Sequence, residues 1–177
     1  MKRHVLPATL SALAALVPGA AWSMKAPDLE TFDDAPAGLV QPGQVVDLEH
    51  FRVETALGTS AIIKRVAPSD ELASGLALGA IDNGGPASVH LSFNEPRRRV
   101  DFTVVMPPSA STLTSVAILY DQDGMQRQAL TIQHSTAGHR MRLGMSVPNG
   151  TSFSRLSLQL QAGAYVDGVE MTSPLAE

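Results

Sequence analysis

The chain of 177 residues is 44% hydrophobic, 17% charged and 5% aromatic, and it contains no cysteine. The lack of cysteine excludes disulfides, thiolate catalysis and thiolate metal sites. A formal net charge of −4 argues against a nucleic-acid-binding protein, which would carry a basic excess. The apolar fraction is also far too high for a disordered chain. The function classes that remain are a binding module, a structural protein and a small enzyme.

The first 23 residues have the pattern of a secretory signal peptide. Lys2 and Arg3 form a positive start, and an apolar stretch follows over residues 5–17. Small residues close the segment, which is the order of a leader that is removed on export. We expect cleavage after Ser23 and a soluble product, in the periplasm or outside the cell, with no transmembrane segment.

The rest of the chain shows the alternation of half-buried antiparallel strands. Apolar side chains recur at every second position in five segments, at residues 88–93, 100–104, 116–120, 140–147 and 156–161. Turn-forming residues separate these segments. Residues 121–124 (DQDG) predict a hairpin rather than a calcium loop, because no closing acidic ligand follows. The sequence therefore predicts one all-β domain over residues 24–177, an antiparallel jelly-roll β-sandwich of about nine to ten strands.

Four short motifs, taken in chain order, resemble those of secreted bacterial β-jelly-roll domains of the galactose-binding-like, carbohydrate-binding-module type. They are TFDD at 31–34, VHLSF at 89–93, YDQDG at 120–124 and YVDGV at 165–169. The resemblance covers most of the chain after the leader. It implies a sandwich in which the first and last strands are neighbours, with a structural Ca²⁺ between them. It also implies a role in binding glycans.

Three acidic residues are candidates for that calcium site. Asp167 shares its strand phase with Tyr165, which predicts that it points inward, and a buried carboxylate needs a partner or a metal. At the other end of the chain the motif favours Asp33, whereas a shared phase with Phe32 favours Asp34. Both remain candidates. Ca²⁺ takes six to eight oxygen ligands, so acids from the two ends of the chain would hold them together.

Aromatic side chains are the candidates for sugar binding, because a flat ring can pack against a pyranose. The chain has few of them, and its only Trp lies in the predicted leader. Three phenylalanines have an inward phase and are assigned to the core, namely Phe32, Phe93 and Phe102. The remaining ligand-binding candidates are Tyr120, Tyr165, Phe51 and Phe153.

The sequence offers little for catalysis. No serine lies in a Gly-x-Ser-x-Gly motif, and no pair of carboxylates is marked out for glycoside hydrolysis. The basic run at residues 97–99 predicts a solvated turn, with a patch for an anionic polymer as the alternative. We therefore expect a non-catalytic module that binds glycans or another surface polymer. The alternatives are a structural envelope protein that binds another protein and, less favoured, a small hydrolase.

Overall fold

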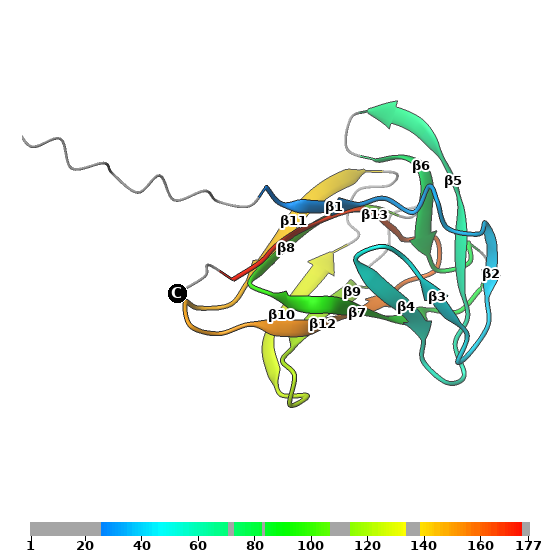
Figure 1. Ribbon diagram of the computed structural model, residues 1–177. Coiled ribbons are helices and arrows are strands. Elements are labelled where there is room, and N and C mark those ends of the chain that lie inside the picture. The colour runs from blue at the N-terminus through cyan, green and yellow to red at the C-terminus, as the bar shows by residue number, and fades with distance from the viewer. Residues whose placement is uncertain (1–25, 71–72, 83, 107–113, 134–138, 175–177) are drawn as a thin grey trace, which may run out of the picture.

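The computed structural model describes residues 26–70, 73–82, 84–106, 114–133 and 139–174. In these ranges thirteen strands form two antiparallel sheets that lie one over the other (Figure 1). The predicted β-sandwich is confirmed. The strands outnumber the expected nine to ten partly because β1, β2 and β3 have three residues each, too few to show alternation. The predicted leader and its cleavage position lie outside the described residues.

The seven-stranded sheet joins the two ends of the domain. Its order is β11 (Arg140–Ser146), β8 (Arg99–Val105), β13 (Tyr165–Thr172), β6 (Ala73–Gly79), β5 (Ala61–Asp70) and β2 (Gly38–Val40). Strand β1 (Asp28–Glu30) pairs with β13, and Leu29 lies opposite Glu170. The first strand (blue) and the last (red) therefore run side by side, as the resemblance implies (Figure 1).

The six-stranded sheet carries most of the alternating segments of the sequence. Its order is β10 (Gln126–Gln133), β9 (Thr114–Tyr120), β12 (Phe153–Leu160), β7 (Ala87–Arg97), β4 (Phe51–Thr55) and β3 (Val45–Asp47). The predicted hairpin joins β9 to β10. Its Gly124 has a φ of 77°, a left-handed conformation that favours glycine. The Asp121 carboxylate accepts a hydrogen bond of 2.8 Å from the Met125 amide and so braces the turn.

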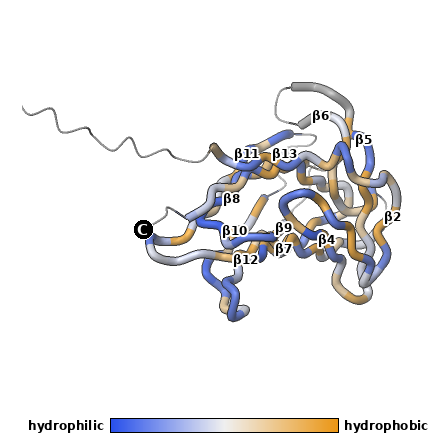
Figure 2. Tube along the Cα trace, in the orientation of Figure 1, coloured by the Kyte–Doolittle hydropathy of each residue, from blue (hydrophilic) through white to orange (hydrophobic). Residues whose placement is uncertain are grey.

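The core lies between the sheets, and hydrophobic and hydrophilic residues alternate along many of the strands that enclose it (Figure 2). Within it four phenylalanine rings form a chain of edge-to-face contacts, with centroids 6.0, 6.0 and 5.5 Å apart. The rings, in order, are those of Phe32, Phe51, Phe93 and Phe153. Phe102 is buried as well, so all three phenylalanines assigned to the core are there.

Phe51 and Phe153 were expected to bind ligand, and this expectation is wrong because both are fully buried. Phe51 alternates inward with Val53 along β4, while Arg52 and Glu54 point outward. Phe153 is placed by a register shift between Phe153 and Arg155, where β12 pairs with β7. The alternation is interrupted there, so Phe153 is fully buried although Arg155, two residues later, lies on the outer face. Neither ring offers a face to a ligand.

A second bulge, in β13, overturns the phase argument for Asp167. The register against β8 shifts between Asp167 and Glu170, and Gly168 within the shift has a φ of 56°. Val166 packs in the main core, whereas Tyr165 packs in a separate small cluster with Ala77. Tyr165 and Asp167 therefore point away from the core, and the bulge turns the later residues of β13 back toward it. Asp167 is nevertheless only 2% exposed.

Candidate functional site

The outer face of the six-stranded sheet carries the site, because its register aligns polar and aromatic side chains across four strands. Arg52 on β4 lies opposite Ser92 on β7. Ser92 lies opposite Arg155 on β12, which lies opposite Tyr120 on β9. These four side chains alternate with core residues on their strands, so they form one row across the outer surface.

Tyr120 and Arg155 form the centre of this row. The Arg155 guanidinium carbon lies 4.7 Å from the centroid of the Tyr120 ring, a cation–π contact. Both side chains are half-buried, and Val116 and Ile118 are half-buried on the same side of β9. The Arg155 Nε is buried and has no hydrogen-bond partner. An aromatic ring thus lies beside a guanidinium that is not fully satisfied.

A second row runs parallel to the first. Glu54 on β4 lies opposite His90 on β7, which lies opposite Ser157 on β12. His90 Nδ1 and Ser157 Oγ are 2.8 Å apart and share a hydrogen bond. Burial and the nearby charge of Arg155 lower the pKa of His90, whereas the Glu54 carboxylate opposes that shift. His90 is therefore held in its neutral form to a lower pH than a free histidine.

We call this surface the Tyr120 face and define it by eight residues, Arg52, Glu54, His90, Ser92, Ile118, Tyr120, Arg155 and Ser157. It combines one aromatic ring and an aliphatic neighbour with hydrogen-bonding groups of both kinds. Small-molecule sites typically have such a mixture of apolar area and a few placed polar groups. Of the four predicted ligand-binding aromatics, Tyr120 belongs to this face.

Tyr165 lies on the outer face of the other sheet and is closed on both sides of its ring. A Cβ placed on Gly79 would come within 2.3 Å of the ring, so Gly79 leaves the space in which Tyr165 lies. The Lys64 Nζ lies 4.6 Å from the ring centroid, and the Tyr165 hydroxyl donates to Asp82. With an exposure of 4%, Tyr165 has no face for a sugar, which corrects its assignment as a ligand-binding residue.

The three calcium candidates are only partly brought together. Asp33 Oδ1 accepts a hydrogen bond of 2.7 Å from the Leu76 amide on β6, and Asp167 lies one residue beyond Val166, which pairs with Leu78 of the same strand. Asp34 is exposed in a turn after β1 rather than in phase with Phe32 on a strand.

These three carboxylates do not form a calcium site by themselves. Among the residues that the structure describes, no three His, Asp or Glu side chains converge as a metal-binding group. Asp167 Oδ1 accepts a hydrogen bond from the Gly168 amide, and the Gly168 carbonyl accepts one from Arg142 at 2.9 Å. The described side chains alone do not supply the six to eight oxygens that Ca²⁺ takes, so backbone carbonyls or water would have to complete a site. The calcium site stays a prediction.

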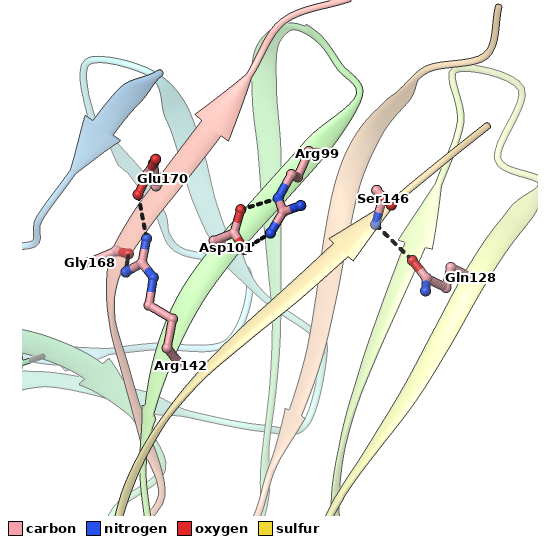
Figure 3. Close-up of polar contacts among 7 residues, drawn as sticks. All are labelled: Arg99, Asp101, Gln128, Arg142, Ser146, Gly168 and Glu170. Atoms are coloured by element: carbon pink, nitrogen blue, oxygen red, sulfur yellow. Dashed lines mark hydrogen bonds and ion pairs between the residues drawn. The ribbon is translucent and has the colours of Figure 1, made fainter. Parts of the chain in front are cut away.

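The outer face of the seven-stranded sheet carries charges that are matched in pairs (Figure 3). Arg142 on β11 bonds Glu170 on β13 at 2.6 Å, and Arg99 contacts both carboxylate oxygens of Asp101 on β8, at 2.5 and 2.7 Å. Gly144 lies opposite Asp101, and a Cβ there would come within 2.5 Å of that carboxylate. These charges satisfy one another and leave little for a ligand.

The basic run at 97–99 is not a solvated turn throughout. Arg97 is 2% exposed, and its guanidinium bonds the Asp28 carboxylate at 2.5 Å and the Ser173 hydroxyl at 3.0 Å. Arg97 therefore ties the end of β7 to the first strand and to the residue after the last strand. Arg99 is exposed and is paired as described above. The run does not form one continuous basic patch.

Comparison with known proteins gives structural similarity without sequence similarity. No family model matches the chain, and no curated protein matches its sequence. Within the described residues, no helix is long and apolar enough to cross a membrane.

Several solved structures of carbohydrate-binding modules resemble the fold. A family 29 module complexed with mannohexaose is 10% identical, with a TM-score of 0.45 over 79% of this chain and 93% of that chain. TmCBM61 in complex with beta-1,4-galactotriose is 17% identical, with a TM-score of 0.46 over 70% and 88%. CsCBM6-3 from Clostridium stercorarium in complex with cellobiose is 13% identical, with a TM-score of 0.43 over 82% and 93%. At sequence identities this low, no binding residue of these modules can be assigned to this chain.

Sequence reasoning found Tyr120 and missed the groups around it. Arg155, His90, Ser157 and Glu54 come from three strands whose order in the sheet the sequence does not state. The available signal was the polar phase of each alternating segment, which marks His90 and Ser157 as outward-facing. Their meeting across β7 and β12 depends on the register, and only the structure provides it.

Proposed function

We propose that this chain is an exported, non-catalytic carbohydrate-binding module and that it binds glycans on the Tyr120 face. The observation that carries the proposal is the half-buried Tyr120 ring beside Arg155 on the outer face of the six-stranded sheet, in line with Ser92 and Arg52. Export rests on the leader pattern of residues 1–23. Residues 24–177 would then act in the periplasm or outside the cell.

The chemistry of a sugar suits this surface. A pyranose has one apolar face of C–H groups and a rim of hydroxyls, each a hydrogen-bond donor and acceptor. Tyr120 and Ile118 supply the apolar contact. Arg155 donates hydrogen bonds, Glu54 accepts them, and Ser92 can do both. This division between apolar contact and orienting polar groups is the usual one for a binding site.

The row of Glu54, His90 and Ser157 has the residue types of a hydrolytic triad, yet its geometry supports binding rather than catalysis. Ser157 is 6% exposed, so its hydroxyl is poorly placed to attack a substrate. The three residues lie on adjacent paired strands, whose backbone amides are largely used in the sheet ladder. An oxyanion hole needs free donors near the nucleophile. We therefore propose that His90 and Ser157 act as hydrogen-bonding groups.

Tyr120→Ala tests the proposed function. The purified protein is screened on a glycan array, and the dissociation constant of the best ligand is measured by calorimetry. Loss of the ring removes apolar contact worth about 1.5 kcal/mol or more, so affinity should fall by about tenfold or more. Tyr120→Phe keeps the ring and should retain most of the affinity.

Tyr165→Phe is the matched control for that experiment. It removes a tyrosine hydroxyl on the opposite sheet and breaks the bond to Asp82. It should leave glycan affinity unchanged, although it lowers stability. A wild-type protein that binds no glycan on the array, or a Tyr120→Ala variant that binds as well as wild type, contradicts the assignment of this face.

Structural Ca²⁺ is kept as a separate proposal that rests on the sequence motifs around Asp33 and Asp167. A bound ion stabilises the folded state by about 2.7 kcal/mol at a hundred times its dissociation constant. For a domain of this size the melting temperature should rise by roughly 5–10 °C. Chelator should reverse the rise, and Asp167→Asn should reduce it, whereas Asp121→Asn in the hairpin should not. An unchanged melting temperature of the wild type removes the calcium proposal.

A further inference from the structure

Within the part of the chain that the structure describes, Arg155 lacks the carboxylate partner that several other cations of the domain have. Elsewhere five described cations lie against carboxylates within 2.8 Å, in the pairs Arg97–Asp28, Arg99–Asp101, Arg127–Asp121, Arg142–Glu170 and Lys64–Asp82. On the Tyr120 face Arg52 is paired in the same way with Asp47. Among the described residues no carboxylate forms an ion pair with Arg155, whose contact is the ring of Tyr120.

The surroundings of Arg155 favour binding of a ligand to its unpaired charge. Its guanidinium is half-buried, and its Nε is shielded from solvent without a hydrogen-bond partner. A desolvated donor of this kind costs free energy unless a ligand or another group satisfies it. The cation–π contact holds the guanidinium beside the Tyr120 ring, and the fork of donors of a guanidinium matches a carboxylate in a bidentate arrangement.

We propose that the Tyr120 face selects acidic glycans, with Arg155 as the group that binds the carboxylate of a uronic acid residue. The proposal rests on the proposed function and adds the ligand class. The sugar ring packs on Tyr120 and Ile118, and its carboxylate meets the guanidinium beside the ring. The acidic balance of the whole chain gives no long-range attraction for such a ligand, so recognition depends on this contact.

The groups around His90 add a pH signature to this recognition. His90 faces Glu54 on β4 and Ser157 on β12. Burial and then the charge of Arg155 lower the pKa of His90, whereas Glu54 opposes that shift. A carboxylate bound at Arg155 would offset that positive charge and raise the pKa of His90 from its lowered value. Binding would then take up protons, so affinity for an acidic glycan should increase as the pH falls through the lowered titration range of His90. A neutral glycan should show no such trend.

The test compares ligands that differ only in charge. Oligogalacturonate, oligoglucuronate and oligomannuronate are titrated by calorimetry beside their methyl esters, with dextran sulfate as a non-specific polyanion. We expect the best uronate to bind about ten- to hundredfold more tightly than its ester, as a charge-assisted hydrogen bond predicts. Arg155→Gln should abolish this preference. Arg155→Lys, which keeps the charge but loses the planar fork, should restore it only in part.

Arg142→Gln is the matched control, because it removes the same charge from the outer face of the other sheet, where Glu170 already compensates it. It should change uronate affinity less than threefold. An equal loss in both variants, or tight binding of dextran sulfate, would indicate diffuse charge attraction and overturn the role of Arg155. Equal binding of uronates and esters overturns the acidic selectivity but leaves glycan binding intact. If the protein binds neither the uronates nor their esters, and binds no glycan on the array, the proposed function itself is overturned.

Discussion

Replacing Asp28 with alanine is expected to lower the free energy of unfolding by about 3–5 kcal/mol, which is the cost of leaving one partner of a buried ion pair alone. Arg97, its partner, is 2% exposed and bonds Asp28 at 2.5 Å. Its Nε is already buried without a hydrogen-bond partner. Without Asp28 the guanidinium keeps its charge in a dry site with the Ser173 hydroxyl as its remaining bond at 3.0 Å.

Urea unfolding and thermal melting measure this effect. At roughly 2–4 °C per kcal/mol for a domain of this size, the melting temperature should fall by about 6–20 °C. The double variant Asp28→Ala with Arg97→Met removes both charges and fills much of the space of the arginine stem. It should recover most of the loss, because an apolar replacement of a buried pair is often neutral. If the single variant costs less than about 1 kcal/mol, the pair behaves as a surface ion pair.

The alternation of apolar and polar residues was enough to predict the strands and their antiparallel sandwich. A period of two reflects one buried and one exposed face, so the sequence carries it directly wherever strands are long, as in β7, β9 and β12. Strands of three residues give no period, and β1, β2 and β3 were missed for that reason. Turn chemistry predicted the β9–β10 hairpin because Gly124 needs a left-handed conformation.

A bulge accounts for the wrong strand phase predicted for Asp167. The prediction carried the phase along β13 across a point where the register against β8 shifts by one residue. After Gly168 the predicted inward direction is correct, because Val169 lies in the core. Before Gly168 it is reversed, because Asp167 points away from the core. Gly168 is a hint in the sequence, since glycine inside an alternating segment often marks a bulge. Phe153 has no such marker, and its position follows only from the pairing of β12 with β7.

The candidate site could be predicted only as separate outward-facing residues. Tyr120, Arg155, His90 and Glu54 come from strands that are distant in the chain, and side chains meet across a sheet only when strand order and register are known. The order β9-β12-β7-β4 places residue 120 beside residue 155 and residue 90 beside residue 54. Buried ion pairs such as Arg97–Asp28 depend on the same long-range pairing, so a basic run in the sequence gave no sign of one.

Phe51→Ala is expected to lower the free energy of unfolding by about 3–5 kcal/mol, as truncation of a buried aromatic ring usually does. Phe51 is fully buried and lies in the middle of the ring chain, 6.0 Å from both Phe32 and Phe93. Removing it therefore breaks two edge-to-face contacts and leaves a cavity that neighbouring strands cannot close. Phe51→Leu fills much of that space and should cost clearly less than the alanine variant.

The same variant separates a core role from a binding role when glycan affinity is measured at a temperature where it remains folded. Phe51 points between the sheets, whereas Tyr120 points outward from the six-stranded sheet. We therefore expect Phe51→Ala to lose stability while its dissociation constant for the best glycan changes less than about threefold, which is about 0.7 kcal/mol. Tyr120→Ala should show the opposite pattern, with small loss of stability and large loss of affinity. A stable Phe51→Ala protein that no longer binds glycan would return Phe51 to the ligand-binding surface and contradict its place in the core.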